Sequence, residues 1–331
     1  MTQDLPFVTV IVPTRPGQAD IKAVDAARKL DYPKDKIEII VARGKQPSVQ
    51  RNTALRAARG EIIYFLDDDS VAPPENLRRA LVHFQRPEVK MAGGPNVCPP
   101  EAPFIEQLFS LTTGSWLAFG PSCARYRPVG RTRESSEKEL ILCNLLARKS
   151  EMLELGGFNE KLYPNEENAL MDELQKRGGK LIYDPELIVY RHPRPTLKAF
   201  IKMLLTYGRG RAEQFRAHPT PGSALNFVPP LFVLYLALLP LMGIADRCCS
   251  SPVICHLLCI SVIPLAFYLC AAAIQAMALT LSPKKIPGVF ALIIMSHILY
   301  GLGFWRGLFT KLQPATSAVT SEIVLETIKL E

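Results

Sequence analysis

Strand-like and helix-like segments alternate over the amino-terminal part of the chain. Short runs of β-branched and other apolar residues are followed by segments whose apolar residues recur at helical spacing. The expected strands cover residues 7–13, 37–42, 61–66, 89–92 and 180–183, and the first three expected helices cover residues 19–29, 49–58 and 75–85. This rhythm predicts an α/β fold with a doubly wound, Rossmann-like sheet and right-handed crossovers.

The pattern changes near residue 226, where long uncharged stretches begin. Residues 226–245, 248–283 and 286–305 contain no Asp, Glu, Lys or Arg. A helix needs about 20 apolar residues to cross a bilayer, and each stretch is long enough. The helices of a soluble bundle would also be apolar on one side, but they would carry a polar face, which these stretches lack. We therefore expect three transmembrane helices, at about 227–245, 253–281 and 286–305.

The first residues of the chain have no basic region followed by an apolar core, so no signal peptide is expected. Residues 1–195 are therefore expected to form a cytoplasmic domain at the inner (plasma) membrane. Residues 196–225 are expected to form an amphipathic juxtamembrane helix and a linker. Basic residues before the first span and Lys284-Lys285 before the third agree with this orientation. Three crossings would leave the tail, residues 311–331, on the outer side.

The chain is basic, with 39 Lys and Arg against 31 Asp and Glu and a formal charge of +8. This charge suits an anionic membrane leaflet and phosphorylated substrates. It does not indicate nucleic acid, because no motif combines aromatic and basic residues for base stacking. The eight cysteines form no Cys-x-x-Cys pair, so neither a disulfide framework nor a zinc site is expected.

The most informative candidate site follows the apolar run at residues 62–66. Asp67, Asp68 and Asp69 come directly after it, at the edge where open α/β sheets bind ligands. Mg²⁺ or Mn²⁺ takes one or two carboxylates and completes its coordination with water and phosphate oxygens. Asp67 and Asp69 are therefore candidates for a metal–diphosphate site. Asp68 points the other way in an extended chain, which suits a structural role, and together with Arg51 it is also a candidate for binding the donor. A solvated acidic loop or a helix N-cap is the simpler alternative.

Other candidates lie at strand ends and helix starts. Pro13, Thr14 and Arg15 end the first strand at the same sheet edge, where they could contact a nucleotide base or ribose. Glu167, or alternatively Glu166, could act as a general base that takes a proton from an acceptor hydroxyl. Acidic residues in a first helical turn also complement the helix dipole, which explains both glutamates without catalysis.

Two further candidates lie nearer the membrane. Arg209 and Arg211 are flanked by glycines and could neutralise a departing diphosphate, although positive-inside topology explains them equally well. His192 follows the expected strand at residues 187–190 and could be a third metal ligand. A structural histidine is the alternative.

Taken in order, several of these segments resemble the family 2 glycosyltransferases, which have the GT-A fold and use nucleotide-sugar donors. The similarity spans roughly residues 7–192. It comprises the first strand with its Pro-Thr end, the Gln-Arg-Asn run around Arg51, the strand leading into the three aspartates, and Gly156-Gly157-Phe158 before the glutamate pair. The resemblance implies that Asp67 and Asp69 bind a divalent cation on the donor diphosphate. It also implies that the glutamate pair supplies the base of an inverting displacement.

The resemblance implies an enzyme of cell-surface polysaccharide or glycolipid synthesis that acts on a lipid-linked, polyprenyl acceptor. UDP is the expected carrier, although Ala42-Arg43-Gly44-Lys45 stands where many relatives carry Asp-Asp-Gly-Ser. Residues 208–211 differ from the Gln-x-x-Arg-Trp of processive synthases, so we expect addition of a single sugar. The alternatives are a transferase acting on polyprenyl phosphate itself and a non-catalytic membrane scaffold. The oligomeric state is left open.

Overall fold

The computed structural model describes residues 5–160, 166–217, 221–249, 252–310 and 323–330. The chain divides into two compact units. The sheet unit comprises Met1–Ala102, Pro121–His192 and Gln313–Glu331, and the helical unit comprises Pro103–Gly120 and Pro193–Leu312. The chain thus leaves the sheet unit for the 18 residues of 103–120, returns to it, and leaves it again after His192.

The sheet unit contains an eight-stranded mixed sheet with the order β10-β2-β1-β3-β7-β4-β8-β6. β1 pairs in parallel with β2 and β3, whereas β7 is antiparallel to both β3 and β4. A separate pair is formed by β5 and β9. The strands are β1 (Val8–Thr14), β2 (Ile37–Arg43), β3 (Ile62–Leu66), β4 (Val89–Gly93), β5 (Asn96–Val97), β6 (Arg133–Ser135), β7 (Asn144–Arg148), β8 (Lys180–Tyr183), β9 (Val189–Tyr190) and β10 (Val324–Lys329).

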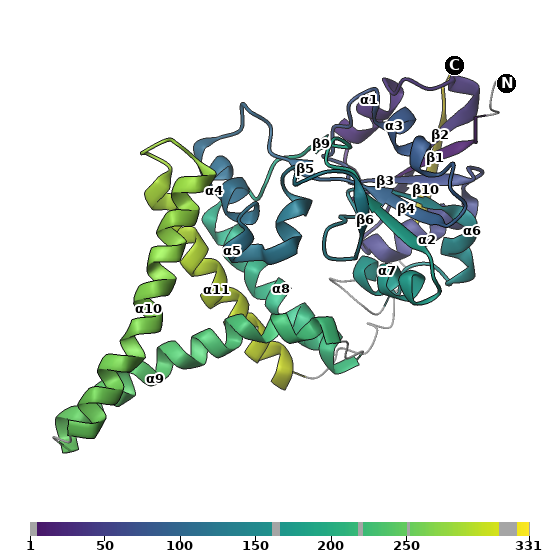
Figure 1. Cartoon of the computed structure of the whole chain (residues 1–331). Coiled ribbons are helices and arrows are strands. Elements are labelled where there is room, and N and C mark those ends of the chain that lie inside the picture. Colours follow the sequence, from purple (N-terminus) through teal and green to yellow (C-terminus); the bar gives the residue numbers. More distant parts are fainter. Residues whose placement is uncertain (1–4, 161–165, 218–220, 250–251, 311–322, 331) are drawn as a thin grey trace. The chain divides into compact units, whose positions relative to one another are not determined.

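Helices cover both faces of this sheet (Figure 1), because its central strands are apolar on both sides. In β3, Ile62, Tyr64 and Leu66 join one hydrophobic core, and Ile63 and Phe65 join the other, as the two-residue period of a strand requires. α1 and α3 supply residues to the first core, and α2, α6 and α7 to the second. These helices are α1 (Lys22–Arg28), α2 (Pro47–Ala57), α3 (Asn76–His83), α6 (Lys149–Glu154) and α7 (Glu166–Lys176).

The alternating strands and helices expected from the hydrophobic pattern are therefore confirmed, and they build a doubly wound mixed sheet. The carboxyl-terminal tail differs from expectation. Residues 324–329 form β10, which pairs antiparallel with β2 from Val324↔Arg43 to Lys329↔Glu38. The tail was expected on the opposite side of a membrane from this domain, and its place in the sheet contradicts that expectation.

The helical unit consists of α4, α5, α8, α9, α10 and α11, together with the short 3₁₀ helix η3. Their bounds are α4 (Phe104–Thr113), α5 (Trp116–Phe119), α8 (Leu197–Ala217), η3 (Pro221–Phe227), α9 (Val228–Cys249), α10 (Pro252–Leu279) and α11 (Ile286–Phe309). Two further 3₁₀ helices, Lys34–Lys36 and Gly120–Arg125, complete the secondary structure. Three helices are long and apolar enough to cross a membrane, over Ala224–Arg247, His256–Leu279 and Ile286–Phe309, which agrees with the three apolar helices expected.

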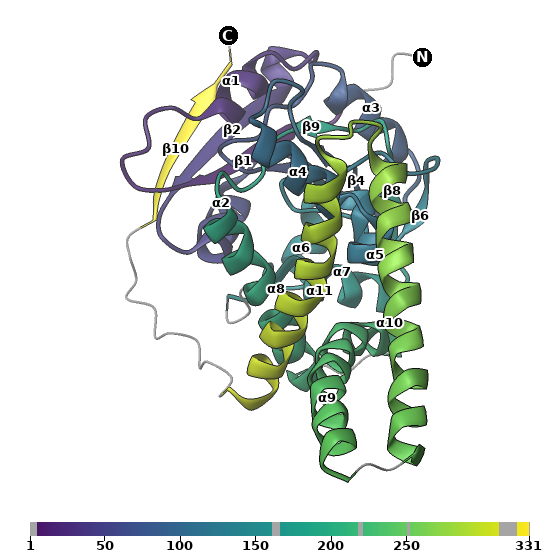
Figure 2. The same ribbon diagram turned by 90° about the vertical axis from the view of Figure 1, so that its left-hand side faces the viewer.

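Residues 103–120 are the main difference in domain organisation. The sequence analysis includes them in a domain covering residues 1–195, but in the structure they group with the helices near the end of the chain. Figure 2 shows α8 beside α11, and a hairpin formed by α9 and α10.

Candidate active site

The three aspartates lie at the carboxyl end of β3, between the end of β1 and the start of β7 in the sheet. Asp67 begins a tight turn, in which the amide of Ser70 donates to the Asp67 carbonyl at 3.0 Å. The next residue, Val71, forms an antiparallel bridge with Tyr190. This bridge brings Arg191, which is far away in sequence, beside the aspartates.

Two arginines hold the aspartate side chains. Arg51 Nη2 donates to Asp67 Oδ1 at 2.9 Å, and Arg191 Nη1 lies 3.2 Å from Asp67 Oδ2. Arg191 also donates through Nε to Asp69 Oδ1 at 2.6 Å. Asp67 and Asp69 therefore lie on one side of the turn, joined through a shared guanidinium. Asp68 faces elsewhere and accepts a hydrogen bond from Thr14 Oγ1 at 2.9 Å.

The environment of Arg191 keeps it charged. Burial lowers the pKa of Arg191, but the neighbouring carboxylates of Asp67 and Asp69 outweigh burial and hold that pKa well above its usual value. Cys143 is buried beside this group, and burial raises the pKa of its thiol to about 11. The thiol is therefore protonated near neutral pH.

Arg51 also links the aspartates to the first turn of α7. Its Nη1 lies 3.6 Å from Glu166 Oε1, and both side chains are buried. Glu166 is thus buried and forms an ion pair inside the protein. Glu167, the next residue, is only partly buried. Residues 161–165, which precede this turn, lie outside the described residues.

Residues next to Arg51 on α2 fix the surrounding loops. Gln50 Nε2 donates to the carbonyls of Thr14 at 2.8 Å and Ala42 at 2.5 Å, which joins the ends of β1 and β2. Asn52 binds both the amide and the carbonyl of Phe158, at 2.8 and 2.9 Å. Gly157 has a φ of 79°, and a Cβ there would overlap the Asn52 amide oxygen. The Gln50-Arg51-Asn52 run therefore supports the loops on both sides of the acidic turn.

The remaining residues predicted for the sheet unit lie at the ends of strands or just beyond them. Pro13 and Thr14 end β1 and are buried, and Arg15 is exposed just beyond them. His192 follows Arg191 and is partly buried. Among the described residues, no group of three or more His, Cys, Asp and Glu side chains could hold a metal, so the structure does not assemble His192 with the two aspartates.

A divalent metal nevertheless fits the donor set at the turn. Asp67 and Asp69 offer hard carboxylate oxygens, and their side chains are partly exposed, at 23% and 44%. A site of this kind needs only one or two carboxylates when substrate phosphates supply further oxygens. Arg51 and Arg191 balance the negative charge of the carboxylates around them.

Arg209 and Arg211 belong to α8 of the helical unit. Arg209 Nε lies 3.3 Å from Glu213 Oε1, and Arg211 Nη1 donates to Gln214 Oε1 at 3.1 Å. The glycine between Tyr207 and Arg209 serves packing, because a Cβ on Gly208 would overlap the carbonyl of Tyr300 in α11. The close approach at this glycine is therefore between α8 and α11.

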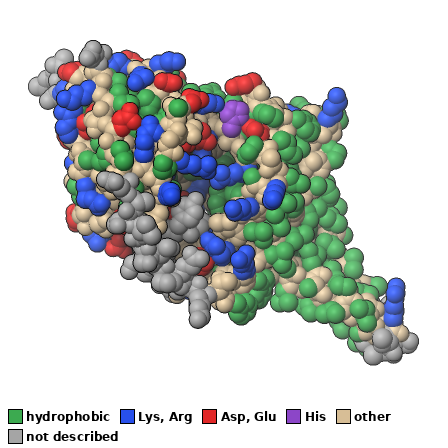
Figure 3. Space-filling view, turned by 180° about the vertical axis from the view of Figure 1, so that it is seen from behind, with side chains coloured by type: hydrophobic (Ala, Val, Ile, Leu, Met, Phe, Trp, Pro, Cys, Tyr) green, Lys and Arg blue, Asp and Glu red, His purple; other side chains and the backbone are tan. Residues whose placement is uncertain are grey.

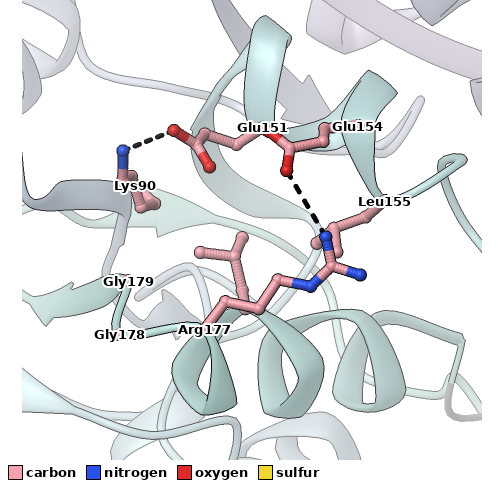
Figure 4. A pocket seen from close by; sticks show the side chains of 8 residues that line it. Lys90, Glu151, Glu154, Leu155, Arg177, Gly178 and Gly179 are labelled. Carbon is pink, nitrogen blue, oxygen red and sulfur yellow. Dashed lines mark hydrogen bonds and ion pairs between the residues drawn. The ribbon is translucent and has the colours of Figure 1, made fainter.

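A pocket with a volume of ≈ 170 Å³ lies at the opposite edge of the sheet (Figure 4). It adjoins the starts of β4 and β8, whereas the aspartates follow the end of β3. Drug-sized ligands occupy cavities of roughly 300–1,000 Å³. The charged side chains of this pocket pair with one another, Lys90 with Glu151 and Arg177 Nη1 with Glu154 Oε1 at 3.5 Å. Neither its size nor its charges indicate a substrate site.

The doubly wound mixed sheet, with the acidic turn at the end of β3, has the architecture of the GT-A fold. A sequence model of glycosyl transferase family group 2 matches residues 62–305, which is most of the chain, and the chain belongs to this family. A mannosyltransferase from Pyrobaculum calidifontis, solved with GDP-mannose and Mn²⁺, has a similar fold. The TM-score is 0.52 and the identity 19%, over 93% of this chain and 88% of that one.

Curated relatives are more similar in sequence but longer. The chain is 26% identical over 186 residues to a pre-mycofactocin glycosyltransferase of Mycobacterium tuberculosis, which covers 53% of this chain and 36% of the relative. It is also 26% identical over 157 residues to the succinoglycan biosynthesis protein ExoA of Rhizobium meliloti, covering 46% and 43%. The chain thus spans less than half the length of these relatives.

Proposed function

We propose that the protein transfers a single sugar from a nucleotide-sugar donor, with UDP as the expected carrier, to a lipid-linked acceptor at a membrane, with inversion at the anomeric carbon. The observation that carries the proposal is the acidic turn after β3. In a chain of this family, Asp67 and Asp69 lie on one side of that turn, and Arg51 links Asp67 to the first turn of α7.

Asp67 and Asp69 would hold Mg²⁺ or Mn²⁺, which would supply positive charge to the donor diphosphate and so stabilise the leaving group. Glu167 takes the proton of the acceptor hydroxyl, whose oxygen attacks the anomeric carbon as the bond to the diphosphate breaks. We assign the base to Glu167 because Glu166 is buried against Arg51. His192 is not assigned a role.

Residues near the diphosphate and the base are proposed to act as follows. Thr14 fixes Asp68, which keeps the turn in place. Pro13 and Arg15, at the end of β1, would contact the nucleoside. Arg51 orients both Asp67 and Glu166 and is therefore a positioning residue. Arg209 and Arg211 are proposed, from the sequence, to neutralise the departing diphosphate.

The helices that could span a membrane support an acceptor carried by a lipid, with the sheet unit on the cytoplasmic side. The relative named for succinoglycan biosynthesis is consistent with a role in cell-surface polysaccharide synthesis.

The direct test measures transfer from radiolabelled nucleotide sugars in membranes that contain the full chain. Asp69→Ala should reduce transfer at least ~100-fold, because a group that stabilises the leaving charge is lost. The matched control is Asp31→Ala, since Asp31 pairs with Arg78 at 2.8 Å on the surface. Full activity of Asp69→Ala after metal chelation would contradict the proposal.

A further inference from the structure

The position of β10 constrains how the chain can cross a membrane. β2 and β10 are neighbours in one sheet over six residue pairs, so residues 37–43 and 324–329 must lie on the same side of any bilayer. Because α9, α10 and α11 all lie between these strands in sequence, the number of complete crossings between them must be even. Three crossings are therefore incompatible with the sheet.

The packing of α11 indicates which of the three helices does not cross. Its amino-terminal half contacts α4 and α5. Lys285 Nζ donates to Gln107 Oε1 at 2.6 Å, and His297 Nε2 lies 2.9 Å from the Leu117 carbonyl. The chain enters and leaves residues 103–120 from the sheet unit, and these 18 residues are too few to cross a bilayer and return. The first half of α11 thus packs on a segment that stays on the side of the sheet.

The carboxyl-terminal half of α11 packs on α8, which precedes the first apolar span. A Cβ on Gly303 would overlap the carbonyl of Leu205, and one on Gly307 would lie 2.5 Å from that of Arg209. Arg216 Nη1 also donates to the Gly307 carbonyl at 3.1 Å. These glycines allow the two helix backbones to approach closely. Both halves of α11 are therefore covered by segments that have not crossed a membrane.

α9 and α10 differ from α11 in what covers them. In the most apolar windows of α9 and α10 only 6% of residues are buried, against 33% for α11. Figure 3 shows hydrophobic side chains gathered over the helical unit. At 22 and 28 residues, α9 and α10 are about 33 and 42 Å long at 1.5 Å per residue, which exceeds a hydrocarbon core of about 30 Å. Lipid is the partner that this length and apolar surface fit.

We propose that the protein crosses the membrane twice, as an α9–α10 hairpin, and that α11 stays on the side of the sheet unit, packed on α4, α5 and α8. This inference rests on the membrane-bound function proposed above. Asp246 and Arg247 end α9 near the hairpin tip, and charged side chains are costly at the bilayer centre. A complete crossing carries them to water on the far side. Lys284 and Lys285 then lie on the cytoplasmic side, as positive-inside topology favours.

The first test locates the tail and the tip in sealed membrane vesicles. An epitope tag after Glu331 should survive external protease in right-side-out vesicles and be lost in inside-out vesicles. A cysteine placed at Arg247 (Arg247→Cys), in a protein whose native cysteines are replaced by serine, should react with a membrane-impermeant maleimide in right-side-out vesicles, and the cysteine-free parent should not be labelled. A tag cleaved in right-side-out vesicles, or a tip labelled only after permeabilisation, would overturn the proposal.

The second test checks that β10 lies beside β2 in the membrane-bound protein. Arg43→Cys combined with Val324→Cys places two thiols on paired residues, and a short bis-maleimide should link them. The matched control combines Arg43→Cys with Lys329→Cys, five residues further along β10. At about 3.3 Å per residue, the second pair is roughly 17 Å apart and should not be linked. Linking in the control alone, or in neither pair, would contradict the topology.

Transfer assays separate this inference from the proposed function. A tail found outside, in a protein that still transfers sugar and still depends on Asp69, would overturn the two-crossing topology alone. Absence of transfer with the tail inside and the tip outside would count against the enzymatic proposal alone.

Discussion

The sheet unit and the helical unit both contain uninterrupted apolar runs, but the two units differ in how far those runs are buried. In β3 every residue is buried, because helices cover both faces of the sheet. In α10 the apolar run is several times longer, and only 6% of its most apolar window is buried. The strand-length run of apolar residues in β3 thus packs inside the sheet unit, whereas α9 and α10 leave most of their apolar surface exposed. α11 is intermediate, and its packing on α8 explains why.

The units also differ in how they use charge. The sheet unit buries carboxylates in pairs, with Glu166 on Arg51 and Asp184 on Arg79. The helical unit contains only three carboxylates, Glu106, Glu213 and Asp246. The sheet unit therefore contains most of the acidic groups of the chain, whereas the helical unit contains the three helices that are long and apolar enough to cross a membrane. The predictions that follow test this division, from the largest expected effect to the smallest.

The largest effect is expected at the base. Glu167→Gln should reduce transfer to a hydroxyl acceptor by about 10²–10⁴-fold, because the attacking hydroxyl loses its proton acceptor. Glu173→Gln, on the same helix and paired with Arg177 at 3.1 Å, is the control and should be nearly as active as the unchanged protein. Steady-state rates with a lipid-linked glycan measure both. Near-normal rates for Glu167→Gln would favour polyprenyl phosphate as the acceptor, since that group is already ionised.

Loss of Arg51 should be the largest change in stability. Arg51→Ala leaves Glu166 buried without this partner, and breaking a buried ion pair from one side costs about 3–5 kcal/mol. Arg56→Ala, on the exposed side of the same helix, should change the free energy of unfolding by less than about 0.5 kcal/mol. Denaturant unfolding of the two variants would show the difference. Equal stability of the two variants would mean that Arg51 does not hold the site together.

A matched glycine pair contrasts α11 with α9. Gly303→Ala should lower the stability of the detergent-solubilised protein by about 1–3 kcal/mol, because a Cβ there overlaps the Leu205 backbone. A Cβ on Gly243 in α9 would meet no atom within 4 Å, so Gly243→Ala should be neutral or slightly stabilising. Melting temperatures report both. A larger loss at Gly243 than at Gly303 would contradict the packing of α11 on α8.

The smallest effect concerns pH. Burial raises the pKa of Asp184, but hydrogen bonds from His83 and Arg79 outweigh burial and hold that pKa well below its usual value. A carboxylate with a lowered pKa in the folded state adds stability above its unfolded pKa of about 3.9, and that stability is lost as the pH falls. Asp184→Asn should therefore be less stable at pH 7 and should lose less stability between pH 7 and pH 3.

Urea midpoints at the two pH values measure this linkage. Asp25→Asn is the control, since Asp25 is exposed and pairs with Arg28 at 3.5 Å within one helix. If Asp184→Asn loses as much stability on acidification as the unchanged protein, the Asp184 network is not a source of acid sensitivity.

Much of the sheet unit was predictable because its signals are local. The apolar runs that form β1, β2 and β3 and the acidic turn after β3 are each contained in a few consecutive residues. The positions of Asp67 and Asp69 on one side of the turn, with Asp68 on the other, also follow from the period of an extended chain.

The remainder depends on contacts between residues far apart in sequence. Arg191 reaches the aspartates through the bridge between Val71 and Tyr190, and no local pattern marks that bridge. The sequence instead drew attention to the neighbouring His192, since histidine is the commoner metal ligand. β10 was missed for the same reason, because the strand that it pairs with, β2, lies almost 300 residues earlier. The apolar stretches in the sequence predict three membrane spans. The pairing of β10 with β2 adds the condition that the number of complete crossings between these strands is even.

The central claim is that Asp67 and Asp69 bind a metal together with the donor diphosphate. The most direct measurement is the melting temperature of the detergent-solubilised protein with UDP and Mn²⁺, separately and together. The account predicts a clear rise only when both are present, because ligands that bind the folded state raise its stability. It also predicts that Asp67→Asn/Asp69→Asn abolishes the rise, while Asp31→Asn retains it. A rise of equal size in the double variant would contradict the claim.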